Sequence, residues 1–145
     1  MRIHPYLNFD GKTEEAVRFY AQALGGKLTE IHRFGSMPSQ GGLELTPEQK
    51  NLVMHVGLEL PDGQMIMASD VLEGMGPPHV EGNNISISVH PDSRQDADRI
   101  FNALAQGGTI TMPIADQFWG DYFGSLTDRF GINWMVNHTP ASRPQ

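Results

Sequence analysis

The sequence of 145 residues contains no cysteine. A chain without thiols has no disulfide framework, no thiolate metal ligand and no cysteine nucleophile. Long hydrophobic runs are missing as well: no stretch could span a bilayer, and the start of the chain, Met1 to Tyr6, holds no apolar run of signal-peptide length. These absences predict a cytoplasmic protein that does not bind membranes.

Basic residues are scarce. The chain has ten Lys and Arg against 17 Asp and Glu, which gives a formal net charge of −7 and a sequence pI of about 5.2. The basic residues are scattered singly, whereas binding to a polyphosphate requires them in clusters. The composition therefore predicts no nucleic-acid partner.

Motifs for common chemistries are absent too. The sequence has no Gly-x-Ser-x-Gly, no His-Glu-x-x-His and no paired cysteines. Gly11-Lys12-Thr13 resembles the end of a phosphate-binding loop, but Tyr6 stands where that motif requires its first glycine. We therefore expect Lys12 to be a solvated turn residue.

What the chain does contain is a repeat. A helical pattern from Thr13 to Leu24 ends at Gly25-Gly26, and a second one from Ser93 to Gln106 ends at Gly107-Gly108. A strand-like run precedes each helix and further strands follow it. The long spacing between the copies predicts two fused copies of one small α+β module rather than a solenoid.

Alternating apolar residues predict the strands of each module. Thr13 is the expected N-cap of the first helix, and a long polar loop is expected from Gly35 to Glu48. The predicted strands of the first module are Ile3–Phe9, Leu28–Phe34, Val53–Leu60 and Gln64–Asp70; those of the second are Asn84–His90, Thr109–Ile114, Tyr122–Thr127 and Ile132–His138.

We therefore predict one domain, residues 1–145, of the α+β class. It consists of two fused βαβββ modules, residues 2–71 and 83–139, joined by a linker at 72–82 and followed by a short C-terminal tail. The modules are expected to form a curved mixed sheet with a central cleft. Clefts of this kind are where small-molecule sites occur.

Alternation also predicts a polar face on the sheets, opposite the face that packs on the helices. The residues expected there are His4, Tyr6, Asn8, His55, Asn84, Ser86 and Ser88. A polar face of an antiparallel sheet is often merely solvated, and this interpretation stays open beside that of a partly polar binding site.

The residues at this point resemble a known superfamily. The chain resembles the vicinal-oxygen-chelate proteins in its element order, in Tyr6-Leu7-Asn8-Phe9 before the first helix and in Ala16-Val17-Arg18-Phe19-Tyr20 within it. That superfamily includes glyoxalase I, bleomycin-binding proteins, fosfomycin-resistance enzymes and extradiol dioxygenases. A C-terminal set of residues is similar to the PhnB-like branch: Met112-Pro113, Phe118-Trp119-Gly120-Asp121, Gly124, Asp128-Arg129-Phe130-Gly131 and Trp134.

The resemblance implies four metal-ligand positions in the cleft. By strand position they fall on His4, Met67, Asn84 and Met135. Two thioethers and an amide supply neither charge nor strong basicity to a divalent ion, so we predict no metal and no other cofactor. A divalent metal on this atypical set is the alternative.

The predicted pocket contains these four residues together with Tyr6, His55 and Trp119. His55 and His4 are the candidate catalytic residues, since an imidazole can act as a general base. The alternative for His55 is a structural histidine whose ring is bonded to a backbone carbonyl. Four aromatics, Phe118, Trp119, Tyr122 and Phe123, could form a wall over the cleft or a hydrophobic plug, with Trp119 near the pocket and Phe123 in the core.

Three functions follow as hypotheses. The first is a metal-free PhnB-like protein that binds a small organic ligand in the cleft between the modules. The second is a metal-dependent glyoxalase-type lyase, isomerase or thiol transferase with an atypical ligand set. The third is a methyltransferase, although the chain lacks the glycine-rich loop of the common S-adenosylmethionine fold. The resemblance also implies a homodimer.

Overall fold

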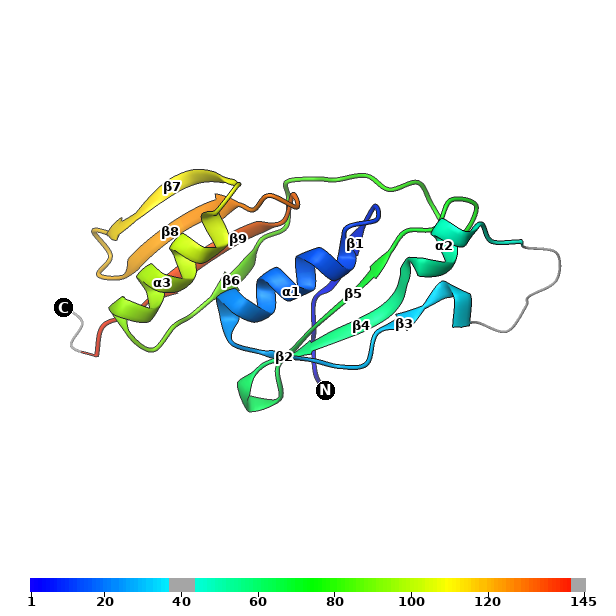
Figure 1. Cartoon of the computed structure of the whole chain (residues 1–145). Helices are drawn as coiled ribbons and strands as arrows, with labels where there is room; N and C mark the ends of the chain where they lie inside the picture. The colour runs from blue at the N-terminus through cyan, green and yellow to red at the C-terminus, as the bar shows by residue number, and fades with distance from the viewer. Residues whose placement is uncertain (37–43, 142–145) are drawn as a thin grey trace. The chain divides into compact units, whose positions relative to one another are not determined.

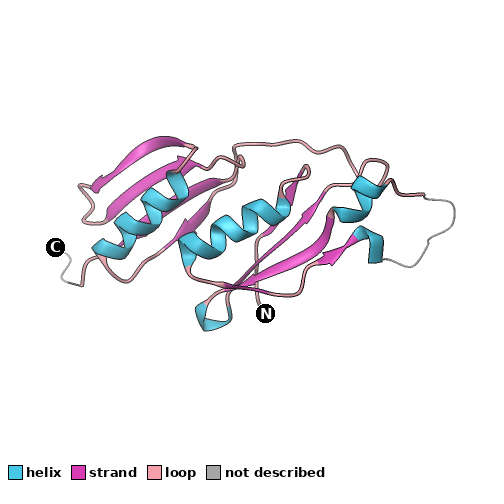
Figure 2. Ribbon diagram, in the orientation of Figure 1, coloured by secondary structure: helices cyan, strands magenta, loops and turns pink. Residues whose placement is uncertain are grey.

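The computed structural model describes residues 1–36 and 44–141, and it divides the chain into two compact units, Met1–Val80 and Glu81–Gln145. In each unit one sheet carries a long helix on one of its faces (Figure 1). Helices and strands are both present in each unit (Figure 2), so the predicted α+β class is confirmed.

The sheet of unit 1 is mixed. Its strands are β1 (Tyr6–Phe9), β2 (Lys27–Leu28), β3 (His32–Arg33), β4 (Val53–Glu59) and β5 (Met65–Asp70). The order is β1-β5-β4-β2, with β3 also paired to β4. The edge strand β1 runs parallel to β5, and their register sets Tyr6 opposite Met67.

The sheet of unit 2 repeats this plan. Its strands are β6 (Ile87–Val89), β7 (Thr109–Asp116), β8 (Tyr122–Thr127) and β9 (Asn133–His138), in the order β6-β9-β8-β7. The edge strand β6 runs parallel to β9, with Ser88 opposite Met135. Met67 and Met135 therefore occupy matching places in the two units, and so do their partners Tyr6 and Ser88.

Each unit has its hydrophobic core between sheet and helix. Helix α1 (Thr13–Leu24) buries one face on unit 1, and α3 (Arg94–Ala105) does so on unit 2. Alternate residues of the strands join these cores, as the period of two requires. The buried set includes Ala16, Val17, Tyr20, Val56, Leu58 and Ala68 in unit 1, and Ala97, Phe101, Leu104, Leu126, Trp134 and Val136 in unit 2.

The repeated Gly-Gly pair has the same cause in both units. Gly25 and Gly107 have positive φ, 80° and 73°, which glycine adopts without a Cβ penalty at the end of a helix. The next glycine lies against a strand carbonyl: a Cβ on Gly26 would be 2.8 Å from the oxygen of Glu59, and one on Gly108 would be 2.3 Å from that of Thr127. The pair thus turns the chain and lets the helix end approach the sheet.

Several predicted boundaries were wrong. The single strand predicted from Leu28 to Phe34 is two short strands, because the chain leaves the ladder between β2 and β3. Part of the predicted loop is helical: η1 (Phe34–Ser36) and α2 (Pro47–Asn51) lie on either side of residues outside the described part. Thr46 caps α2 with a complete capping box, which the sequence analysis missed.

Two more predictions differ at strand starts. The predicted strand at Asn84 begins only at Ile87, and Ile85 is 76% exposed rather than packed on the helix. The predicted hairpin after Val53 is confirmed, with η2 (Pro61–Gly63) as its turn. The predicted C-terminal tail lies mostly outside the described residues.

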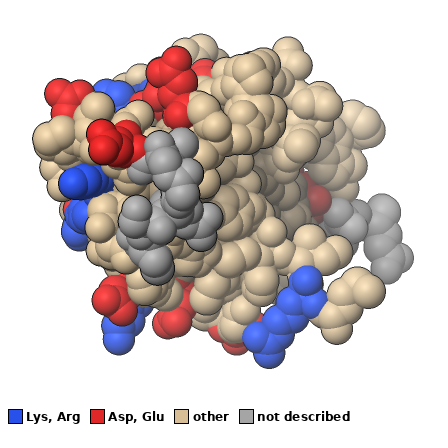
Figure 3. Space-filling view, turned by 90° about the vertical axis from the view of Figure 1, so that its right-hand side faces the viewer, with Lys and Arg blue, Asp and Glu red and all other residues tan. Residues whose placement is uncertain are grey.

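Charged side chains of both signs are interspersed on the face shown in Figure 3, which displays no large basic patch. This agrees with the scattered Lys and Arg of the sequence. Among the described residues, none of the helices combines the length and the apolar character that a membrane crossing requires.

Candidate functional site

The open face of the unit 1 sheet, opposite α1, carries a hydroxyl–imidazole pair. The Tyr6 hydroxyl lies 3.3 Å from Nδ1 of His55, and the two rings are 5.8 Å apart between centroids. Tyr6 comes from the edge strand β1 and is 45% exposed, whereas His55 on β4 is half-buried. Because β5 lies between these strands, the pair spans the sheet above Met67.

Gly57 is buried on the strand next to Met67. It stands opposite Met67 on β4, and a Cβ there would lie 3.2 Å from Sδ of Met65 and 3.3 Å from the side chain of Thr29. The Thr29 hydroxyl accepts a hydrogen bond from the Gly57 N–H at 2.8 Å, and the Thr29 N–H donates to the Gly57 carbonyl. Thr29 therefore holds the backbone at Gly57, and the side chains of Thr29 and Met65 fill the space that a side chain on Gly57 would need.

Unit 2 has a corresponding pair on its open face. Ser88 Oγ lies 2.9 Å from Nε2 of His90, two residues along the same strand. Ser88 stands opposite Met135, which is 37% exposed. Next to Met135 on β8, Ser125 exchanges a 2.7 Å hydrogen bond with Thr111. In both units, therefore, the residue opposite the matched methionine, Met67 or Met135, carries a hydroxyl within hydrogen-bond distance of an imidazole.

The aromatic wall predicted from the sequence forms within unit 2. Trp119 packs edge-on against Phe118, with centroids 5.0 Å apart, and against Phe123 at 6.1 Å. Phe123 alternates with the buried Tyr122 and Gly124, so it lies on the open face of the sheet rather than in the core, contrary to our expectation. Trp119 is 43% exposed and Phe118 98%. An apolar surface thus borders the open face of unit 2.

The predicted pocket residues divide between the two units. His4, Tyr6, His55 and Met67 belong to unit 1; Asn84, Trp119 and Met135 belong to unit 2. His4 lies just before β1 and is half-buried, and Asn84 is exposed before β6. The registers match Tyr6 with Ser88, so the residue that corresponds to His4 is Ser86, two positions after Asn84. The place of Asn84 in a pocket stays a prediction.

The four positions at which the superfamily would hold a metal ion do not suit one in this chain. The four positions implied by the superfamily offer one imidazole, one amide and two thioethers, a poor donor set for a borderline or hard divalent ion. Within residues 1–36 and 44–141, no three His, Asp or Glu side chains gather closely enough to hold an ion. We therefore derive no chemical step through a metal at these positions.

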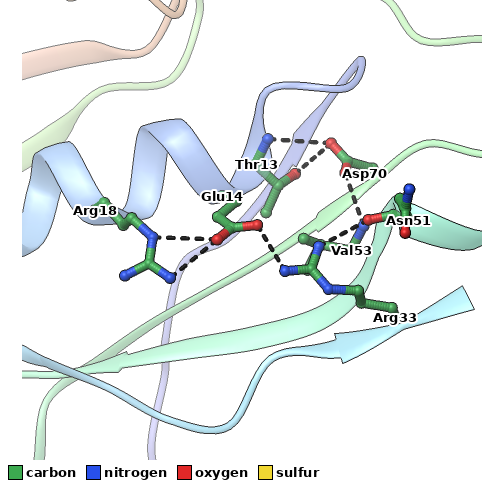
Figure 4. A network of polar contacts seen from close by, with 7 residues as sticks. All are labelled: Thr13, Glu14, Arg18, Arg33, Asn51, Val53 and Asp70. Carbon is green, nitrogen blue, oxygen red and sulfur yellow. Dashed lines mark hydrogen bonds and ion pairs between the residues drawn. The ribbon is translucent and has the colours of Figure 1, made fainter. Parts of the chain in front are cut away.

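The start of α1 is already occupied by a side chain. The buried carboxylate of Asp70, at the end of β5, accepts hydrogen bonds from the backbone N–H of Thr13 at 3.1 Å, from its hydroxyl at 2.7 Å, and from the N–H of Val53 at 2.8 Å (Figure 4). Thr13 is therefore the first helical residue and not the predicted N-cap, which is Lys12. The carboxylate of Asp70 therefore takes the Thr13 N–H, one of the groups that an anion at this helix start would use.

A second group of contacts ties α1 to β3. Glu14 accepts hydrogen bonds from Arg33 at 2.8 Å and from Arg18 at 2.9 Å, and Arg33 also donates to the carbonyl of Asn51 (Figure 4). The Arg33 and then the Arg18 guanidinium lower the pKa of Glu14 by hydrogen bonding to its carboxylate. Arg33 thus points to the helix side of the sheet, away from the open face.

Residues 1–137 match the model of a protein family described as 3-demethylubiquinone-9 3-methyltransferase. The chain belongs to that family. This family also accounts for the resemblance found in the sequence, because a solved member is described as a putative 3-demethylubiquinone-9 3-methyltransferase, PhnB protein, from Bacillus cereus; it is 26% identical, with a TM-score of 0.76 over 96% of this chain and 100% of that one.

Two further solved structures place this member of the 3-demethylubiquinone-9 3-methyltransferase family in the predicted fold. Protein PA1353 from Pseudomonas aeruginosa is 40% identical, with a TM-score of 0.83 over 96% of this chain and 98% of that one. A glyoxylase/bleomycin resistance protein/dioxygenase domain from Frankia is 17% identical, with a TM-score of 0.66 over 99% and 94% of the two chains, and this likeness shows the fold alone. The predicted PhnB-like branch and vicinal-oxygen-chelate fold are confirmed.

The sequence analysis of this family member missed His32 and His90. His90 lay at the end of a predicted strand, two residues after Ser88, and that spacing alone puts the two side chains on one face. The position of His32 opposite His55 could not be predicted from spacing. The two residues lie on different strands, and the sequence between them does not reveal how those strands are aligned.

Proposed function

We propose that this chain binds a small, partly apolar organic molecule on the open face of the unit 1 sheet, without a divalent ion at the four positions implied by its superfamily. The hydroxyl–imidazole pair of Tyr6 and His55 above Met67 is the observation that carries this proposal. The predicted cleft between the modules as the place of binding stays a prediction.

The chemistry of this face supports such a ligand. The Tyr6 ring and the Met67 thioether offer polarisable apolar contact, and the imidazole of His55 can donate or accept one hydrogen bond. We therefore propose a ligand of one or two aromatic rings with a hydroxyl or carbonyl group.

The experiment is a thermal-shift screen of EDTA-treated protein against one- and two-ring aromatic alcohols and ketones, followed by calorimetric titration of the compounds that raise the melting temperature. A ligand that binds the native state stabilises it by RT ln(1 + [L]/Kd), so the melting temperature rises with the ligand concentration. The proposal requires saturable binding in EDTA that weakens in both Tyr6→Phe and His55→Gln, while Ser88→Ala, the matched change in unit 2, leaves it unaltered. Binding that appears only after a divalent ion is added would favour the glyoxalase-type alternative.

The description of the family favours a second candidate, methyl transfer to 3-demethylubiquinone-9. Such an enzyme must bind a methyl donor, and the loop before α1 that could cradle one has its helix N–H bonded to Asp70. Calorimetric titration of the protein with S-adenosylmethionine tests this candidate directly. Saturable micromolar binding would establish it over simple ligand binding.

A further inference from the structure

Two histidines stand directly opposite each other on neighbouring strands of unit 1. The register of β3 and β4 pairs His32 with His55. Residues that oppose each other in an antiparallel pair project from the same face, with Cβ atoms about 4.5–5.5 Å apart. Two imidazoles at this separation can reach one point between them.

Both side chains lie on the open face. His55 alternates along β4 with the buried Val56, so it faces away from α1. His32, its partner across the strands, shares that face, while Arg33, on the other side of a register shift, reaches to Glu14 on α1 at 2.8 Å. His32 is exposed and His55 half-buried.

Tyr6 sets the orientation of the second imidazole. Its hydroxyl lies at Nδ1 of His55, which leaves Nε2 without a partner from Tyr6. When Nδ1 carries the proton and donates it to the phenol oxygen, Nε2 keeps its lone pair. A hydrogen bond at the far ring nitrogen is the usual second contact of a histidine that ligates a metal, since it fixes the tautomer and the direction of the ring.

We propose that His32 and His55 together form a binding site for a borderline divalent transition metal, with Cu²⁺ the tightest, held through Nε2 of His55 and a ring nitrogen of His32. Imidazole suits Cu²⁺, Ni²⁺ and Zn²⁺, and affinity rises toward Cu²⁺ in this series. Neither residue of the pair completes a group of three His, Asp or Glu among the described residues, so the remaining coordination positions go to water or small ligands.

This site differs from the four positions of the superfamily and goes beyond the proposed function, because the ion needs no organic ligand and the organic ligand needs no ion. The two ideas fail separately. Organic binding is measured in EDTA, whereas the metal is titrated into protein that holds no organic compound.

The test uses the full chain, freed of metal with EDTA and transferred to a non-coordinating buffer. Calorimetric titration with Cu²⁺ is expected to show one saturable site, and pulsed electron paramagnetic resonance of the one-to-one complex is expected to show two coordinated imidazoles. His32→Gln and His55→Gln should each lower the affinity for Cu²⁺ at least ~10-fold. Loss of a residue that only hydrogen-bonds a metal ligand already lowers affinity by that much, and loss of the ligand itself should cost no less. His90→Gln in unit 2 is the matched control and should bind as the wild type does.

Three results would overturn the proposal: no saturable Cu²⁺ site, a spectrum with a single imidazole, or undiminished binding in the two variants of unit 1. Circular dichroism melting curves show whether the variants are folded. If either variant is unfolded, the imidazole count in the wild-type spectrum decides the question alone.

Discussion

The two units share one order of strands, but different side-chain contacts stabilise each of them internally. In unit 1 the buried carboxylate of Asp70 joins the start of α1 to the start of β4. At the matching place in unit 2 stands His138, whose ring nitrogen lies 2.9 Å from the carbonyl of Pro91, just ahead of α3. Helix α3 begins instead with a local cap, because Ser93 accepts the N–H of Asp96.

Unit 2 has two buried carboxylates, Asp121 and Asp128, and neither bonds the start of its long helix in the contacts seen here. Asp128, in the turn before β9, accepts hydrogen bonds from the N–H groups of Phe130 and Ile132 and from the indole of Trp134 at 2.8 Å. The carboxylate therefore organises a hairpin in unit 2 and a helix start in unit 1. The comparison teaches that backbone plan and glycine turns are common to both copies, while the contacts of the buried carboxylates differ between them.

The largest expected effect comes from removing these carboxylates. Asp70→Ala leaves three buried donors unsatisfied, at about 1–3 kcal/mol each, so we expect unit 1 to lose at least about 3 kcal/mol of stability. Hydrogen exchange should show lost protection in α1 and at the start of β4. Asp128→Ala should cost a similar amount but expose β8 and β9. Equal loss of protection across both units in either variant would contradict this division.

The glycines that follow each helix come next. Gly108→Ala would place a Cβ 2.3 Å from a backbone oxygen, whereas Gly26→Ala meets the movable ends of Leu58 and Leu60 as well as a carbonyl at 2.8 Å. We expect both to destabilise, by about 1–3 kcal/mol, with the larger loss in Gly108→Ala because a backbone atom must shift. Urea unfolding of the two variants measures the difference. A larger loss of stability in Gly26→Ala would contradict this expectation and would show that the backbone around Gly108 can shift at little cost.

The hydroxyl–imidazole pairs should separate binding from stability. Tyr6→Phe removes one exposed hydrogen bond, and we expect the affinity for an aromatic ligand to fall several-fold, in line with about 1 kcal/mol, while the melting temperature hardly changes. Ser88→Ala should alter neither. A loss of affinity in Ser88→Ala equal to that in Tyr6→Phe would mean that unit 2 shares the ligand. Calorimetry on the two variants in parallel makes this comparison.

Acid should weaken unit 1 slightly. The pKa of Glu14 is lowered by Arg33 and Arg18, so its contribution is present above the ordinary carboxyl pKa and is lost as the pH falls through the lowered value. The groups are partly exposed, so the effect should stay below about 1 kcal/mol. Glu14→Gln should reduce stability at pH 7 and change nothing once the pH lies below the lowered pKa. An unchanged free energy of unfolding of Glu14→Gln at pH 7 would show that the ion pairs of Glu14 do not stabilise unit 1.

Alkali should weaken unit 2 instead. Tyr122 donates to the carboxylate of Asp98, which raises the pKa of the phenol. Its contribution is present below the ordinary pKa of tyrosine and is lost as the pH rises through the raised value. Ultraviolet titration of tyrosinate should show a tyrosine that ionises late in the wild type and earlier in Asp98→Asn. Identical titration curves would show that the hydrogen bond does not persist in solution.

Much of the fold was accessible from the sequence because its signals are local. The Gly25-Gly26 and Gly107-Gly108 pairs and the alternating strands depend on neighbours in the chain. What could not be read depends on residues far apart. Thr13 was mistaken for a cap because Asp70, which holds it, lies 57 positions later.

The candidate site was less accessible for the same reason. Alternation placed Tyr6 and His55 on polar faces, but their contact spans 49 positions. The match of His4 with Asn84 assumed that the two strands are aligned from their predicted first residues. The registers of β1 and β6 instead align Tyr6 with Ser88, and therefore His4 with Ser86. The spacing of Ser88 and His90 was visible in the sequence and was overlooked.

The central claim is that the open face of unit 1 binds an organic ligand without a superfamily metal. The most direct measurement is nuclear magnetic resonance of protein labelled at its eight methionine methyl groups, in EDTA, during titration with an aromatic ligand from the screen. We predict a saturable shift of the Met67 methyl that Tyr6→Phe reduces. A Met67 signal that stays unchanged while the ligand binds, or that moves only after a divalent ion is added, would contradict the claim.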